Sequence, residues 1–138
     1  MRTETRHTIL RIFLYLAGST TLLAFVAAVM PGEWMIWIAD VSGIADFPEH
    51  PLTWYLARHL SAMYGLFGVG ILIMATDLDR YLPLLRVTAW GLIALGFLQF
   101  AIDSSAPMPA YWTWSEASSS AFGGLCIMYL ARKDSQEQ

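Results

Sequence analysis

The sequence predicts an all-α integral membrane protein, an antiparallel four-helix transmembrane bundle formed by a single domain over residues 1–138. Hydrophobic residues make up 57% of the chain and charged residues only 14%, with a mean hydropathy of +0.50. A soluble domain carries about 25% charged residues. The chain therefore has too few charges to cover a surface that faces water, and its apolar residues gather into four long segments.

Each of these segments approaches the roughly 20 apolar residues that a helix needs to cross a bilayer. The predicted spans are about 9–30, 52–76, 81–102 and 111–130. The first ends at the helix-breaking pair Pro31-Gly32, and the third carries Pro83 in its first turn, where proline is tolerated. Only the tail at 133–138 is predicted to be disordered.

The basic residues predict the orientation, because Lys and Arg mark cytoplasmic loops. Seven of the eight lie at the termini or flank the second connection: Arg2, Arg6, Arg11, Arg80, Arg86, Arg132 and Lys133. The charged residues of the first and third connections are all acidic: Glu33, Asp40, Asp46, Glu49 and Asp103. This pattern predicts a multi-pass protein of the plasma (inner) membrane, with both termini in the cytoplasm (N-in/C-in).

Both predicted outer connections are aromatic. Residues 34–38, Trp-Met-Ile-Trp-Ile, indicate a short helix or turn in the outer interface, since Trp favours the headgroup level. Residues 107–114 contain two prolines, two tryptophans and a tyrosine. That connection either anchors the bundle in the interface or covers a ligand.

Charged residues inside spans mark candidate functional sites, because they are costly in lipid. Arg58 lies about two turns into the second span, and Asp103 and Glu116 lie at a similar depth on the third and fourth. A carboxylate at a helix C-terminus opposes the helix dipole, so Asp103 needs a cation, a capping role or water, and Arg58 is the only cation on that side. We expect Arg58 to pair with Asp103, Glu116 or both; the alternative is that Arg58 snorkels to the outer headgroups.

The helix faces that carry these charges run from polar at the outer end to small in the middle. They predict a polar pocket open to the outside, floored by close helix packing at Gly65, Gly96 and Gly123. The candidate ligand-binding residues are Arg58, Asp103, Glu116, Gln99, Ser61 and His59.

No motif in the sequence predicts a metal or a cofactor. His50 and His59 lack the spacing of a metal site, and His50 is expected to help cap the second span or to lie in the interface. The segment 77–80, Asp-Leu-Asp-Arg, is expected to be a solvated turn with capping acids, because it lacks the EF-hand glycine and terminal glutamate. The lone Cys126 has no partner for a disulfide or a metal motif, and nothing predicts nucleic-acid binding.

The stretch 55–65, Tyr-Leu-Ala-Arg-His-Leu-Ser-Ala-Met-Tyr-Gly, followed by Asp77 and Arg80-Tyr81, resembles small four-span bacterial membrane proteins of the DoxX-like type. The resemblance implies the same four-span architecture. Members of that group are mostly of unknown function, and some are associated with oxidoreductase complexes. The four-span proteins of the sterol-isomerase type are a more distant likeness, because they place acids and histidines in a deep pocket, whereas His50 and His59 lie near the outer end here.

The predicted function is non-enzymatic. The chain is expected either to bind a small molecule or lipid in its polar pocket, or to be a small subunit of a larger membrane complex. The expected partners are membrane lipids, other membrane protein subunits or a second copy of the chain. The alternative is a membrane-embedded enzyme, an isomerase or an oxidoreductase-associated protein, that uses Arg58, Asp103 and Glu116.

Overall fold

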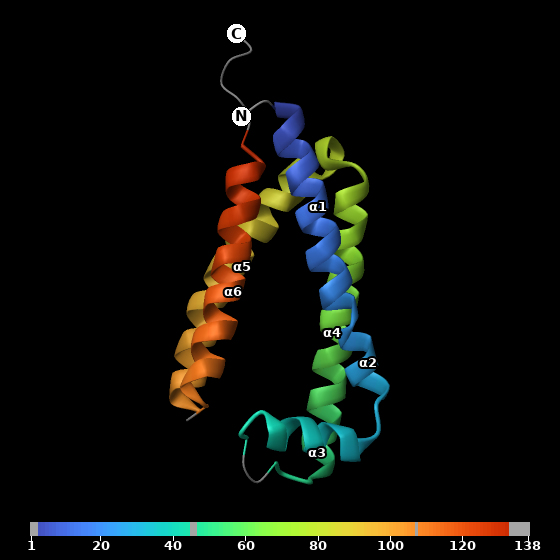
Figure 1. The fold of residues 1–138 in the computed structure, drawn as a ribbon, viewed down its shortest axis with the longest axis vertical. Helices are drawn as coiled ribbons and strands as arrows, with labels where there is room; N and C mark the ends of the chain where they lie inside the picture. Colours follow the sequence, from blue (N-terminus) through green and yellow to red (C-terminus); the bar gives the residue numbers. More distant parts are fainter. Residues whose placement is uncertain (1–2, 45–46, 107, 133–138) are drawn as a thin grey trace. The chain divides into compact units, whose positions relative to one another are not determined.

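The computed structural model describes residues 3–44, 47–106 and 108–132, and this part of the chain contains only helices (Figure 1). The helices are α1 (Thr3–Leu22), α2 (Ala24–Val29), α3 (Gly32–Val41), α4 (Pro51–Thr76), α5 (Leu78–Ser105) and α6 (Ala110–Leu130). The all-α prediction is confirmed for these residues. The disorder predicted for 133–138 concerns residues outside the described ranges, as do the predictions that involve Arg2, Asp46 and Pro107.

Three stretches are long and apolar enough to cross a membrane: Glu4–Val29, Pro51–Thr76 and Leu78–Ser105. They correspond to the first three predicted spans. Helix α6 matches the fourth predicted segment in its bounds, but it is not among the three. Glu116 and a run of serines between residues 115 and 120 reduce its hydropathy.

The first predicted span contains a break at Leu23, between α1 and α2. The Leu23 amide donates to Thr20 O at 3.2 Å, three residues back, instead of the four of an α-helix. Two residues earlier, Thr21 Oγ1 donates to Ala17 O at 2.8 Å. Hydroxyl groups that bond back to the preceding turn often bend a helix. The residues 19–21, Ser-Thr-Thr, therefore explain an irregularity that apolar length alone does not predict.

The chain packs as two compact units: one is Leu14–Ile73, and the other combines Met1–Phe13 with Met74–Gln138. In the unit Leu14–Ile73, α4 packs against α1 and α2 through glycines. A Cβ added at Gly68 would lie 2.7 Å from the backbone nitrogen of Leu22, and one at Gly65 would lie 2.6 Å from the ring of Phe25. The absence of side chains at these positions permits the close approach.

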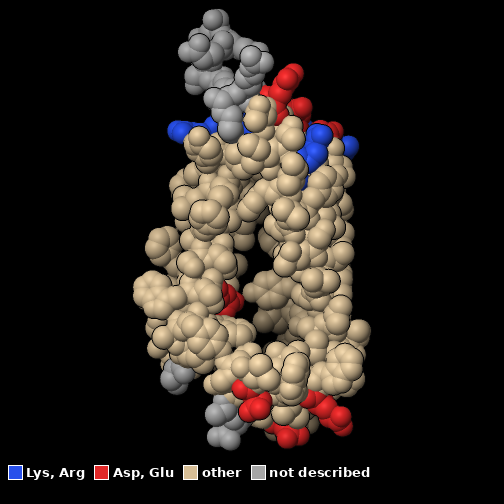
Figure 2. Space-filling view, viewed as in Figure 1, with Lys and Arg blue, Asp and Glu red and all other residues tan. Residues whose placement is uncertain are grey.

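Helix α3 runs across the end of α4 within the same unit (Figure 1). The predicted helix or turn at 34–38 is a helix in the structure. Trp54 of α4 packs against Gly32 and lies 5.4 Å from Phe47, measured between ring centroids. Figure 2 shows acidic side chains gathered over this end, and Glu33, Asp40 and Glu49 line one cavity there.

In the other unit, α5 and α6 lie side by side and antiparallel (Figure 1). A Cβ at Gly96 would lie 2.7 Å from Ala117 O, and one at Gly124 would lie 2.5 Å from Ala89 O. The glycine of α6 in this contact is Gly124, one residue after the predicted Gly123. An added Cβ at Gly123 meets no described atom within 4 Å. One residue turns a helix by about 100°, so the two neighbours face different directions.

The segment 77–80 is not the predicted solvated turn, because Asp77 caps a helix that already begins at Leu78, a residue only 3% exposed. The predicted capping acid is confirmed at Asp77. The Asp77 side chain accepts a hydrogen bond from the Arg80 amide at 3.1 Å. Because α5 begins at Leu78, Pro83 lies in the second turn rather than in the first. Proline at that position removes the amide that would bond to Asp79 O, four residues earlier.

Candidate functional site

The carboxylate of Glu116 on α6 accepts one hydrogen bond from α5 and one from its own helix. Gln99 Nε2 donates to Glu116 Oε1 at 2.8 Å, and Trp112 Nε1 donates to Glu116 Oε2 at 2.7 Å. Both donors are neutral groups. The carboxylate is therefore held in position without a cation, and each oxygen retains a lone pair for a further donor.

Two buried oxygens on the facing side of α5 have no donor. Gln99 and Asp103 are each only 9% exposed, and Gln99 Oε1 and Asp103 Oδ2 have no hydrogen-bond partner among the described residues. Gln99 and Asp103 are four residues apart, so they share one helix face. A buried acceptor without a donor costs about 1–3 kcal/mol.

We refer to Gln99, Asp103 and Glu116 as the acceptor cluster. The buried Thr113 lies one turn of α6 before Glu116. Asp103 lies in the last turn of α5, at the negative end of the helix dipole, which adds to the demand for a cation. With two carboxylates and a free amide oxygen, the cluster is suited to a ligand that offers N–H or O–H donors and positive charge.

The sequence prediction named all three of these residues, but it missed Trp112 as a partner. Trp112 and Glu116 are four residues apart on α6, so their spacing allows the hydrogen bond. The aromatic third connection therefore does more than anchor the chain, because one of its rings donates to the site. Another, Trp114, packs against Phe100 with ring centroids 5.1 Å apart.

Arg58 makes a contact that the sequence did not predict. Its Nη2 donates to Met30 O at 3.2 Å, at the C-terminal end of α2. The last carbonyls of a helix lack intrahelical donors, and a cation there also favours the dipole. The break at Met30-Pro31, visible in the sequence, is the signal that this carbonyl needs a donor.

The other predicted site residues of α4 have separate surroundings. His59 is exposed and stacks on Tyr55, with ring centroids 5.5 Å apart, and Ser61 is half-buried. His50 Nδ1 accepts from the Leu52 amide at 3.2 Å, which confirms the expected capping role. Arg58, His59 and Ser61 lie in the unit Leu14–Ile73, whereas the acceptor cluster lies in the other unit.

Among the described residues, no three His, Cys, Asp or Glu side chains form a group that could hold a metal ion. The observations define a class, an all-helical protein with three helices suited to a membrane and a polar cluster between two packed helices. No family model, curated protein or solved structure matches the chain.

Proposed function

We propose that this chain is a non-enzymatic, four-span membrane protein that binds a lipid with an ammonium headgroup at the acceptor cluster. The observation that carries the proposal is the pair of buried oxygens, Gln99 Oε1 and Asp103 Oδ2, that lack donors beside the carboxylate of Glu116. A phosphatidylethanolamine ammonium offers three N–H donors and a positive charge. The protein groups offer acceptors and negative charge.

The position of the cluster supports a headgroup as the ligand. Asp103 is two residues from the end of α5, so it lies about 3 Å from that end along the helix axis. The last turn of a spanning helix reaches the headgroup level of the membrane. A ligand there keeps its polar part at the interface while its acyl chains remain in the hydrocarbon.

The fourth span in this proposal is α6. A helix of 21 residues is about 31 Å long, close to the thickness of the hydrocarbon core. Helix α6 packs along α5 from the contact at Gly124 to the contact at Gly96. Because α5 is apolar enough to span a membrane, α6 would lie at the same depth in the bilayer as α5. Its polar groups are offset by the hydrogen bonds within the pair.

Arg58 of α4 is proposed as a further member of the site. Its hydrogen bond to Met30 O uses one of the five N–H donors of a guanidinium. The remaining donors suit Asp103 or the phosphate of the bound lipid. Ser61 and His59 of α4 are proposed as further ligand-binding residues, and the DoxX-like resemblance remains part of the proposal.

The test compares two lipids that differ in the donor. Phosphatidylethanolamine has N–H donors, whereas the quaternary ammonium of phosphatidylcholine has none. The purified protein is titrated with each lipid, and bound lipid is counted by native mass spectrometry. We expect a preference of roughly tenfold for phosphatidylethanolamine, the size of a hydrogen bond to a charged group.

Glu116→Gln and Asp103→Asn keep the shape of the site but remove its charge, and each should abolish this preference. Asp79→Asn is the matched control, because Asp79 is an exposed acid on the same helix. The control should keep the preference. Equal binding of the two lipids by the unaltered protein, or equal loss in Asp79→Asn, would contradict the proposal.

A further inference from the structure

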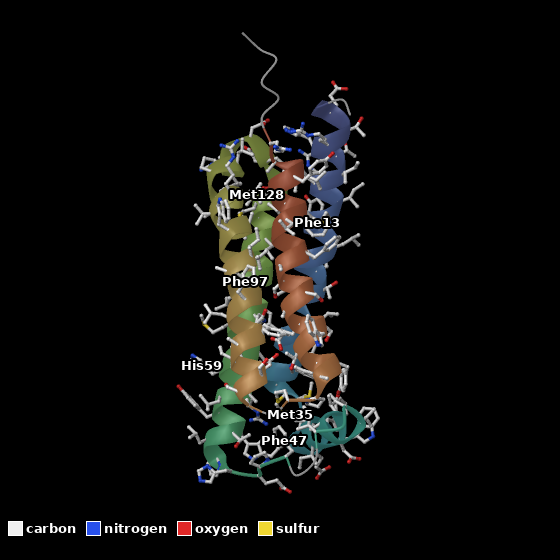
Figure 3. All side chains as sticks on the ribbon, turned by 90° about the vertical axis from the view of Figure 1, so that its left-hand side faces the viewer. Phe13, Met35, Phe47, His59, Phe97 and Met128 are labelled. Carbon is white, nitrogen blue, oxygen red and sulfur yellow. The ribbon has the colours of Figure 1, made fainter. Side chains whose placement is uncertain are left out.

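A second cavity lies at the other end of the α5–α6 pair, where α5 begins and α6 ends. Its volume is about 340 Å³, within the range of small-ligand sites. Its described lining residues are Arg86, Trp90, Met128, Ala131 and Arg132. Met128 is labelled near this end of α6 in Figure 3. The cavity contains no residue of the acceptor cluster.

The charge of this cavity is positive. Two of its lining residues are arginines, and the described lining includes no carboxylate. Within the described ranges, the guanidinium of Arg86 has no hydrogen bond or ion pair, and its side chain is exposed. Figure 2 shows blue atoms at the end of this unit where α6 ends, together with some red atoms at the same end. The site can therefore accept an anion without displacing an internal partner.

The backbone beside Arg132 is held in place by another arginine. Arg6 Nη2 donates to Arg132 O, and Arg6 is only 8% exposed. This contact lies within one unit, since Arg6, α5 and α6 all belong to it. It ties the end of α6 to α1 and so holds the position from which the Arg132 side chain extends.

The apolar wall of the cavity suits the depth of the lipid interface if α5 spans the membrane. Arg86 is eight residues into α5, about 12 Å from its start along the axis, and its side chain leans back toward that start. Trp90 follows one turn deeper and is 64% exposed. Tryptophan favours the boundary between headgroups and hydrocarbon, so the arginines lie on the headgroup side of it.

We propose that Arg86 and Arg132 bind the phosphate of an anionic phospholipid, with Trp90 and Met128 against its glycerol and upper acyl chains. Guanidinium groups bind phosphate oxygens in pairs of parallel hydrogen bonds. Basic pockets between transmembrane helices suit anionic headgroups. Free phosphate has the same anionic chemistry, but it would leave the apolar wall of the cavity unused.

The test uses the full chain in detergent micelles with added phosphatidylglycerol or phosphatidylcholine, and counts bound lipid by native mass spectrometry. We expect phosphatidylglycerol to be preferred. Replacing Arg86→Gln or Arg132→Gln should weaken its binding roughly fivefold each, and both changes together roughly 25-fold, from the usual contribution of one basic residue near a lipid surface. Arg80→Gln is the matched control, because it removes the same charge from the same helix, outside the cavity.

A second readout does not depend on affinity. Brominated phosphatidylglycerol should quench part of the tryptophan fluorescence, and Trp90→Phe should remove that part. Three results would each overturn the proposal: no preference for phosphatidylglycerol, an equal loss in Arg80→Gln, or full displacement of the lipid by millimolar inorganic phosphate. The last result would assign the cavity to free phosphate.

Discussion

At the scale of single residues, the polar side chains of α5 and α6 are organised around acceptors. Glu116 receives neutral donors from two directions, while Gln99 Oε1 and Asp103 Oδ2 receive none from the described residues. In lipid such an imbalance is costly, since no water replaces the missing donor. These residues therefore point to a ligand that supplies the missing donor.

The proposed contact between Arg58 and Asp103 can be tested by a double-mutant cycle. If Arg58 pairs with Asp103 as proposed, Arg58→Ala should lower the free energy of unfolding, and Asp103→Ala in the same chain should recover part of the loss. We expect a coupling energy of about 1 kcal/mol, measured by denaturation in detergent.

The control cycle pairs Arg58→Ala with Asp79→Ala. Asp79 is 24 residues from Asp103 on α5, about 36 Å along the axis, so the two changes should be additive. If the effects of Arg58→Ala and Asp103→Ala are also additive, the two residues are not in contact. Arg58 would then only cap Met30 O and anchor the chain at the headgroups.

At the scale of helices, glycine positions determine which faces meet. The contact between α5 and α6 brings Gly96 against Ala117 O and Gly124 against Ala89 O, both backbone atoms. Backbone atoms in a helix cannot move aside as the end of a flexible side chain can. These contacts therefore set the register that places Gln99 opposite Glu116.

Substitution of Gly96 tests this packing. Gly96→Leu should lower the free energy of unfolding by about 1–3 kcal/mol, because the added side chain meets Ala117 O and forces the helices apart. It should also weaken binding at the acceptor cluster. Gly91→Leu is the matched control on the same helix, since an added Cβ there meets no described atom within 4 Å. Equal melting temperatures for the two variants would mean that the contact does not determine the stability of the pair.

At the scale of the whole molecule, the distribution of charge along the chain predicts how it crosses the membrane. Each terminus carries basic residues, and the connections between residues 31–50 and 103–110 carry acids and no Lys or Arg. An even number of spans places both termini on one side. The location of the C-terminus therefore tests the proposal that α6 is a fourth span.

A reporter that is fluorescent only in the cytoplasm, fused to Gln138, should be fluorescent. The same reporter at the N-terminus should give the same result, because Arg2, Arg6 and Arg11 precede or begin the first span. Fluorescence at the N-terminus with a stable, dark C-terminal fusion would indicate three spans. In that case α6 would not cross the bilayer.

The sequence alone determined the features that depend on neighbours along the chain. Apolar length and composition predicted helices, and their bounds agree with the structure to within three residues, except that the first begins six residues earlier and is broken at Leu23. Capping by Asp77 and His50 was also predictable, because a cap and its amide are two or three residues apart. The same reasoning selected Gln99, Asp103 and Glu116 as polar groups near one end of their helices.

The tertiary structure decided how each helix is rotated and which carbonyls and carboxylates meet a donor. A rotation of about 100° separates Gly123 from Gly124, and the apolar pattern of α6 is too uniform to distinguish them. The bond from Gln99 to Glu116 and the bond from Arg58 to Met30 O join residues 17 and 28 positions apart. Such contacts depend on the register between packed helices, which is a property of the folded pair and not of either segment.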